Sequence, residues 1–147
     1  MTNRNASAMV TTRNNLTLTD EQDRFDVPAV CALIQTADWA SHRGATQIAE
    51  SLRNSTCLVL TDEGRTIGFV RAITDHSVNS YICDFVIAED YRGQKLGTWM
   101  LEVLIAHPDL ARTNQLLITE NAQVFYEPHG FRQHPFTCMK RPTKAWT

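Results

Sequence analysis

Residues 91–101 read Tyr91-Arg92-Gly93-Gln94-Lys95-Leu96-Gly97-Thr98-Trp99-Met100-Leu101. They follow a β-like run, residues 81–87, and open a helical pattern of apolar residues that continues to Ala106. Glycine lets backbone N–H groups approach a ligand closely, and a helix N-terminus adds unpaired donors and a favourable dipole. A strand, a short glycine loop and a helix start therefore predict a phosphate-binding loop, whose few positive charges suit a pyrophosphate better than a nucleic-acid backbone.

Three β-strands in a row are expected before this loop. They span residues 55–61, 66–73 and 80–88, where apolar and β-branched residues gather. Asp62-Glu63-Gly64-Arg65 is a turn of the kind that joins antiparallel strands, and residues 75–79 form a longer turn. These strands are expected to form an antiparallel meander.

Helices are expected to flank this meander. Asp26 is a helix N-cap before Pro28, which favours a first helix, and residues 46–53 form a second. The helix after the phosphate loop ends at His107-Pro108 because the residue before proline avoids the helical region. Residues 115–119 then form a strand parallel to the one before the loop, since strand–helix–strand crossovers are right-handed.

The ends of the chain hold weaker signals. Residues 16–19 alternate as a first edge strand, residues 122–127 form a short helix, and residues 131–139 are a last strand interrupted by Pro135. The predicted fold class is α+β: a mixed, mostly antiparallel sheet with helices on both faces.

Composition limits the classes of function. The 147 residues suggest one domain, predicted over residues 16–147, with a mobile N-terminal tail over residues 1–15. The apolar fraction of 43% supports a packed core, and the net charge of −2 argues against a nucleic-acid-binding surface. Neither a signal sequence nor an apolar run of membrane-spanning length is visible, so no membrane partner and a cytoplasmic location are expected.

Four cysteines are spread through the chain as Cys31, Cys57, Cys83 and Cys138. They form neither a CxxC pattern nor a spacing typical of zinc ligands, so no metal is expected. Cys57 and Cys83 lie in apolar runs, which is typical of buried free thiols.

Arg92-Gly93-Gln94-Lys95-Leu96-Gly97 resembles the acyl-CoA pyrophosphate loop of the GNAT superfamily of N-acetyltransferases. The family pattern is Arg or Gln, two residues of any type, Gly or Ala, any residue, and Gly or Ala; Lys95 stands where glycine is usual. Residues 121–131 resemble the family's later N-A-x-x-x-Y-x-x-x-G-F region. The two motifs occur in the family's order, and the resemblance covers residues 16–139.

The resemblance implies a GNAT-like fold whose central strands are splayed for CoA. It implies transfer of an acetyl group from acetyl-CoA to an amine by direct attack; we take the primary amine of a small molecule as the acceptor. Homodimers are common in the family, so a homodimer is a possible state. The residues expected to bind the cosubstrate are Phe85, Val86, Arg92, Gly93, Gln94, Lys95, Leu96, Gly97, Thr98 and Asn121.

Family position implies roles for Phe85, Val86 and Tyr126. Backbone N–H groups near Phe85 and Val86 would polarise the thioester carbonyl, where negative charge develops. Tyr126 would donate a proton to the leaving thiolate, since a free phenol with a pKa of about 10 is protonated at neutral pH. The other interpretation of Tyr126 is an amphipathic core residue. Asn121 bonds the pantetheine arm or caps the last short helix, and both roles can hold at once.

Asp84 is the charged residue in an otherwise apolar strand. A buried carboxylate is costly unless it is paired. Asp84 therefore either holds the substrate ammonium or draws a proton from it through water, or it pairs with Arg43 or Arg71 as part of the structure. Glu120 is a second candidate for the catalytic role, and Thr119 lines the same pocket.

Trp39 and Arg43 lie between the first two predicted helices, in the region where the family builds its acceptor site. Trp39 is either a hydrophobic plug or a pocket wall. The identity of the acceptor stays open. A non-catalytic acyl-CoA-binding sensor is the alternative function; the GxxxxGK[ST] and GxGxxG signatures of other nucleotide binders are not found.

Overall fold

The computed structural model describes residues 8–143, which divide into two compact units on either side of the Leu117–Ile118 bond. Its first unit contains the sheet. The strands, α-helices and 3₁₀ turns (η) of this unit are β1 (Val10–Arg13), β2 (Leu16–Thr19), η1 (Gln22–Arg24), α1 (Val27–Gln35), η2 (Asp38–Ala40), α2 (Ala45–Arg53), β3 (Thr56–Asp62), β4 (Arg65–Thr74), β5 (Asn79–Ile87), η3 (Glu89–Tyr91), α3 (Leu96–Ile105) and β6 (Asn114–Leu117).

The six strands form one sheet in the order β1-β2-β3-β4-β5-β6. Neighbouring strands are antiparallel except for β5 and β6, which are parallel and joined through α3. The β3–β4 turn places Glu63 and Gly64 at positive φ, as a tight hairpin turn requires. The predicted α+β class, the meander and the parallel last pair are all confirmed.

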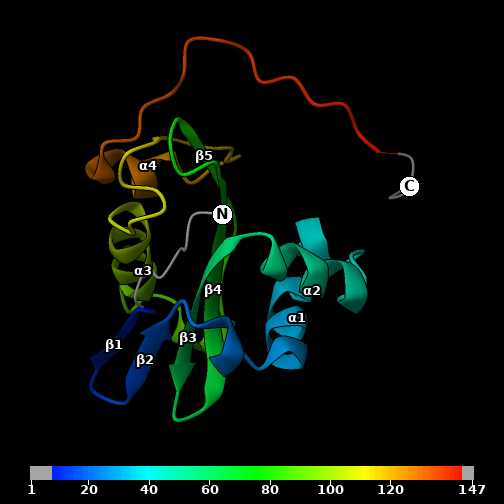
Figure 1. Ribbon diagram of the computed structural model, residues 1–147, viewed down its shortest axis with the longest axis vertical. Helices are drawn as coiled ribbons and strands as arrows, with labels where there is room; N and C mark the ends of the chain where they lie inside the picture. The colour runs from blue at the N-terminus through cyan, green and yellow to red at the C-terminus, as the bar shows by residue number, and fades with distance from the viewer. Residues whose placement is uncertain (1–7, 144–147) are drawn as a thin grey trace. The chain divides into compact units, whose positions relative to one another are not determined.

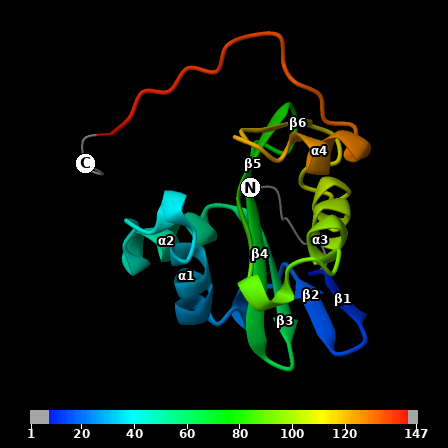
Figure 2. The same ribbon diagram turned by 180° about the vertical axis from the view of Figure 1, so that it is seen from behind.

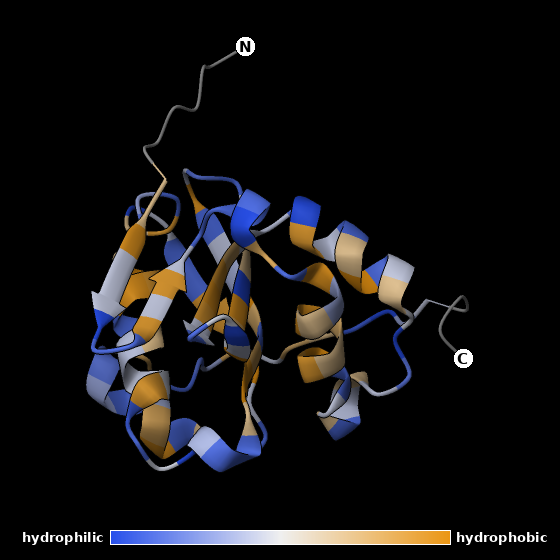
Figure 3. Ribbon diagram, turned by 90° about the horizontal axis from the view of Figure 1, so that it is seen from below, coloured by the Kyte–Doolittle hydropathy of each residue, from blue (hydrophilic) through white to orange (hydrophobic). Residues whose placement is uncertain are grey.

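Helices cover both faces of this sheet, α1 and α2 on one face and α3 on the other (Figures 1 and 2). Asp26 caps α1, since its carboxylate accepts the Ala29 N–H at 3.1 Å. Under α1 and α2 the core includes Phe69 and Val86, both buried. On the α3 face, a Cβ added at Gly68 would lie 2.9 Å from the sulfur of Met100, so glycine is needed for close packing. In Figure 3 the strands carry orange hydrophobic bands and the loops are largely blue.

The predicted N-terminal tail is wrong over Val10–Arg13, which form β1. This strand pairs with β2, so β2 is not the edge strand that its sequence suggested. The strand is largely exposed and polar, and a polar edge strand lacks the apolar alternation on which the sequence prediction depended. The first part of the predicted tail, residues 1–7, lies outside the described residues.

The second unit contains one short helix, α4 (Gln123–Tyr126), followed by η4 (Glu127–His129) within its described residues. The strand predicted over residues 131–139 is wrong, because this segment, exposed from Arg132 onward, forms no strand. Pro135 lacks an N–H to donate, and no ladder of backbone hydrogen bonds holds the segment. Of the helices in residues 8–143, none has the length and apolar character that crossing a membrane requires.

Candidate functional site

The centre of the sheet carries an irregularity at β5. The register between β4 and β5 shifts after Phe69, so Val70 faces two residues, Asp84 and Phe85. This is a β-bulge, which re-aims side chains locally. Asp84 takes a φ of 55°, a left-handed conformation that aspartate tolerates better than most residues.

Beside this bulge, the pairing of β5 with β6 stops. The last paired positions are Ile82 and Leu117, whereas β5 continues to Ile87. All four residues of β6 are paired, so β5 runs on past the end of β6, and the predicted divergence of the two strands stays a prediction. Phe85 and Val86 lie in the part of β5 that β6 does not accompany, where the resemblance puts the CoA arm.

The phosphate loop leads directly into α3. Lys95 is the N-cap of this helix, with φ 60° and ψ 21°, a left-handed conformation that favours glycine. The first helical hydrogen bond runs from the Trp99 N–H to the Lys95 carbonyl at 3.3 Å. The N–H groups of Leu96, Gly97 and Thr98 therefore have no acceptor inside the helix, and they fit the oxygens of a pyrophosphate.

The start of the loop is exposed and braced by its own arginine. Gly93 takes a φ of 79°, with nothing within 4 Å of an added Cβ, so backbone conformation rather than space selects glycine. The Arg92 Nε donates to the Ile87 carbonyl at 3.1 Å. Arg92 thus ties the loop to the end of β5, while Gln94 stays exposed.

Four residues that sequence reasoning did not assign to the site anchor this loop to the β3–β4 hairpin. Arg65 makes two hydrogen bonds to Asp90, from Nη1 at 2.8 Å and from Nη2 at 3.2 Å. The Tyr91 hydroxyl donates to Asp62 Oδ2 at 2.6 Å. The hydrogen bond from Arg65 lowers the pKa of Asp90, and the bond to Asp62 raises the pKa of Tyr91. No sequence pattern indicates these contacts, because Asp62 and Arg65 have only the pattern of turn residues.

Asp84 points to two guanidinium groups from separate elements. Arg43 Nη1 lies 2.9 Å from Oδ1 and Arg71 Nε lies 2.5 Å from Oδ2. Arg71 Nη1 also donates to Ser55 Oγ at 3.1 Å. The carboxylate side chain is only 4% exposed, so a substrate ammonium would have to displace a guanidinium to reach it. Both predicted ion pairs are present, and the catalytic role of Asp84 stays a prediction.

Trp39 lies beside the same cluster. The Arg43 guanidinium carbon lies 5.5 Å from the centre of the Trp39 ring. Trp39 is 48% exposed, so it does not plug the core, and the pocket-wall interpretation stays a prediction. Gln35 Nε2 donates to the Arg43 carbonyl at 2.8 Å and fixes the backbone that carries the guanidinium.

Two thiols flank Arg71 across the sheet. Cys57 of β3 and Cys83 of β5 are its register partners. Burial raises the pKa of Cys57 to about 12 and that of Cys83 to about 11, so both are neutral thiols at pH 7. Neither is therefore set up as a nucleophile.

The second unit carries the remaining predicted residues. The capping alternative for Asn121 is wrong, because Ala122 is the N-cap of α4 and lacks a side-chain cap. Thr119 Oγ1 instead accepts the Ala122 N–H at 3.0 Å, which satisfies one donor at this end of the helix. Glu120 and Asn121 are exposed.

Tyr126 is half-buried at the end of α4. Its ring lies 4.9 Å from that of Phe125 and 5.7 Å from that of Phe131, both in edge-to-face contacts. Burial raises the pKa of the Tyr126 phenol. The phenol is therefore protonated at neutral pH, as a proton donor must be.

A polar cavity of about 490 Å³ lies at the end of the sheet where β3 begins and β4 ends, opposite the end from which β5 enters the phosphate loop. Its carboxylates are already engaged, since Thr56 Oγ1 donates to Asp109 at 2.6 Å and His107 Nε2 lies 2.7 Å from Asp20. The cavity contains none of the sequence-predicted site residues. It is lined by Ala8, Asp20, Arg53, Asn54, Ser55, Thr56, Thr74, His76, His107 and Asp109.

The bulge, the phosphate loop and the Tyr126 helix fall inside one match to a family model. The model, described as an acetyltransferase (GNAT) domain, matches residues 53–133. The chain belongs to the GNAT acetyltransferase family. Within residues 8–143 no group of His, Cys, Asp or Glu is large enough to hold a metal ion.

Similar GNAT proteins come from plants and bacteria. The chain is 28% identical over 127 residues to histone acetyltransferase TAP1 of Glycine max, a match that covers 77% of the chain and 53% of that protein. The chain thus spans about half the length of this curated relative. A crystal structure of a protein from Xanthomonas campestris pv. campestris, described as belonging to the GNAT family, matches with a TM-score of 0.79 and 25% identity, covering 87% of this chain and 93% of that one.

A third match concerns the fold alone. N-acetylglutamate synthase from Neisseria gonorrhoeae, solved with coenzyme A and N-acetyl-glutamate, has a TM-score of 0.67 at 14% identity and covers 83% of this chain and 29% of that one.

Two groups of predicted residues come together in this GNAT chain. The phosphate-loop residues gather at the start of α3, and Trp39, Arg43 and Asp84 meet beside the bulge. Thr119, Glu120, Asn121 and Tyr126 follow one another in the second unit, and their roles stay predictions.

Proposed function

We propose that this chain is an acetyl-CoA-dependent N-acetyltransferase that works in the cytoplasm on the primary amine of a small molecule. The observation that carries the proposal is the set of N–H groups of Leu96, Gly97 and Thr98, which are left without helical acceptors behind the left-handed Lys95. The anchored loop presents them together, as binding a pyrophosphate requires. Family membership supports acetyl-CoA as the cosubstrate.

The chemistry is a direct transfer. The amine nitrogen bonds to the thioester carbonyl carbon, the carbon–sulfur bond breaks, the nitrogen loses a proton and the sulfur gains one. Backbone N–H groups near Phe85 and Val86 stabilise the negative charge that develops on the carbonyl oxygen. Tyr126 supplies the proton to sulfur, and water, Asp84 or Glu120 takes the proton from nitrogen. The neutral thiols of the buried Cys57 and the partly buried Cys83 support a route without an acyl-cysteine.

The charge beside the bulge favours a small acceptor over a basic protein tail. The soybean relative is described as a histone acetyltransferase, and lysine-rich tails are cationic. Arg43 and Arg71 together outnumber the single carboxylate of Asp84. Like charges across a binding site disfavour association, so a lysine-rich peptide is expected to be a poor acceptor.

Isothermal titration of acetyl-CoA into the purified protein, with ATP and NAD as controls, tests the first half of the proposal. Selective micromolar binding is expected, and its absence in a folded protein would refute the phosphate-loop assignment. Release of free CoA thiol in the presence of an amine panel and a histone-tail peptide tests the second half. Binding without transfer to any amine would favour the sensor alternative.

A further inference from the structure

We infer that the acceptor amine carries a carboxylate close to its nitrogen, as a free amino acid does, and that Arg43 binds this carboxylate with Arg71 behind it. The inference rests on the proposed N-acetyltransferase function and names the substrate class of that site. It follows from the surplus of positive charge, the spare donors and the position of the Arg43–Asp84–Arg71 cluster.

The surplus charge is largely shielded from water. Arg43 is 22% and Arg71 13% exposed at the side chain, and within residues 8–143 both make ion pairs only with Asp84. The neighbouring thiols are neutral, since the pKa of Cys57 is raised to about 12 and that of Cys83 to about 11. One positive charge is thus left without an anion in a partly desolvated place, where an anionic ligand gains most.

Spare donors remain on both guanidinium groups. Arg43 gives Nη1 to Asp84, which leaves Nε and Nη2 without a hydrogen bond to the described part of the chain. Arg71 gives Nε to Asp84 and Nη1 to Ser55, which leaves Nη2. The planar Arg fork matches the two oxygens of a carboxylate better than a point charge does.

Arg43 is also held in place before any ligand arrives. Trp39 lies against its guanidinium at 5.5 Å, and Gln35 binds its backbone carbonyl at 2.8 Å. A donor whose conformation is fixed in advance loses less entropy on binding. Because Trp39 is about half exposed, a small ligand can approach this pair from solvent.

The position of the cluster limits the length of the acceptor. Asp84 directly precedes Phe85, near which the proposed thioester carbonyl is polarised, and consecutive Cα atoms lie about 3.8 Å apart. A carboxylate on Arg43 would therefore lie beside the residues that hold the thioester, which favours an acceptor that carries its carboxylate near its amine. Free amino acids carry such a carboxylate, whereas polyamines and lysine side chains within a peptide do not.

Matched pairs of acceptors test the inference. Each of a panel of free L-amino acids is compared with its carboxamide, which keeps the amine and side chain but loses the negative charge. For the preferred amino acid, kcat/KM is expected to exceed that of its amide by about tenfold or more, as loss of a charge-assisted hydrogen bond would give. Arg43→Gln is expected to bring this ratio close to one.

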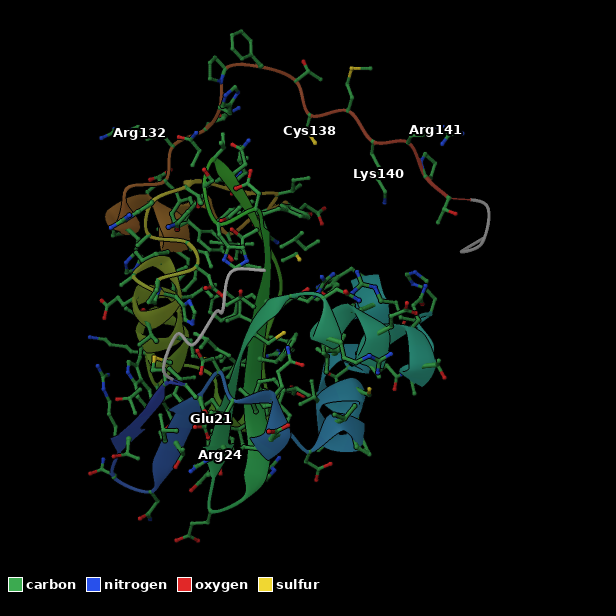
Figure 4. All side chains as sticks on the ribbon, in the orientation of Figure 1. Glu21, Arg24, Arg132, Cys138, Lys140 and Arg141 are labelled. Carbon is green, nitrogen blue, oxygen red and sulfur yellow. The ribbon has the colours of Figure 1, made fainter. Side chains whose placement is uncertain are left out.

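Two further variants separate charge from geometry and from folding. Arg43→Lys keeps the charge but loses the planar fork, so it is expected to keep part of the preference for the acid over its amide. If Arg43→Gln does not fold, Arg43→Lys is expected to remain folded. Arg24→Gln removes a positive charge from the exposed Glu21–Arg24 pair (Figure 4) and is expected to leave the ratio unchanged. Affinity for acetyl-CoA, measured by titration, verifies the fold of each variant.

The outcomes are distinct. Equal transfer to acids and amides, or a preference that survives in Arg43→Gln, overturns the inference and leaves the proposed function standing. No transfer to any amine or peptide, with acetyl-CoA bound, refutes the proposed function, and the inference then falls with it.

Discussion

Arg71 and Asp84 face each other across the β4–β5 bulge, with Arg71 Nε 2.5 Å from Asp84 Oδ2. Arg43 reaches the other oxygen of the same carboxylate from the loop before α2. Asp84→Asn would leave both guanidinium groups partly buried without an anion. We expect the free energy of unfolding to fall by about 3 kcal/mol, measured by urea denaturation, because breaking a buried ion pair from one side is costly.

A matched variant at an exposed ion pair is the control for this prediction. Asp90 pairs with Arg65 at the surface, and Asp90→Asn is expected to change stability little because water screens such pairs. Equal effects of the two substitutions would mean that the Asp84 cluster is no more important to stability than a surface pair.

The left-handed backbone of Lys95 makes a prediction about stability. Lys95→Gly is expected to stabilise the protein relative to Lys95→Ala by about 1 kcal/mol, since a Cβ is strained in this conformation and glycine is not. Both variants lose the same charge, so their difference isolates the backbone. Thermal unfolding checks the difference, and equal stabilities would mean that Lys95 is not strained.

The N-terminus of α3 is expected to bind the pyrophosphate. Gly97→Val adds a β-branched side chain beside the N–H groups there, and we expect acetyl-CoA affinity to fall about tenfold or more through the lost close approach. Glu102→Val places the same β-branched side chain at an exposed position of the same helix but leaves the N-terminus intact. Titration calorimetry compares the two; unchanged affinity in Gly97→Val would remove the loop assignment.

Two tyrosines are expected to affect different kinetic constants. Tyr126→Phe removes the proposed proton donor, so kcat should fall roughly 100-fold with little change in acetyl-CoA affinity. Tyr91→Phe removes the hydrogen bond to Asp62 that anchors the phosphate loop, so it should raise KM for acetyl-CoA instead. Steady-state kinetics distinguish them, and equal losses of turnover and affinity in Tyr126→Phe would indicate a packing role.

The pH profile gives an independent check on Tyr126. Its phenol donates only when protonated, and burial raises its pKa above the ordinary value of about 10. Activity that depends on this proton is therefore retained through neutral and mildly alkaline pH and is lost only as the pH rises past the raised pKa. A decline in kcat that begins below pH 10, and that Tyr126→Phe does not show, would contradict the raised pKa of the Tyr126 phenol.

Thiol reactivity should follow burial. Cys138 is exposed on the extended C-terminal segment (Figure 4), whereas Cys31 and Cys57 are buried and Cys83 is partly buried. With Ellman's reagent at pH 8, Cys138 is expected to react first and the other three only on unfolding, because burial raises the pKa of each of them. Cys138→Ser is the control, and fast labelling of that variant would show that a second thiol is accessible.

Local patterns account for most of the fold that could be predicted. Asp26 with Pro28 gave the start of α1, and the Asp62–Arg65 turn gave the β3–β4 hairpin. Each depends on residues a few positions apart, whose backbone preferences act without help from the rest of the chain. The two errors concern β1, which was not predicted, and residues 131–139, which were predicted as a strand. Whether such a segment forms a strand depends on whether the edge of a neighbouring strand is available, and its own residues do not encode this.

The sequence by itself determined the glycine-containing loop and the helix that follows it, because glycine positions and a helix start are local features of residues 91–101. It also determined the parallel crossover, because the handedness of strand–helix–strand units is fixed by chirality. Only the tertiary structure decided that Arg43, Arg71 and Asp84 meet, and that Arg65 and Tyr91 anchor the loop. These contacts join residues far apart in the chain, and the bulge and strand register that bring them together arise from packing of the whole sheet.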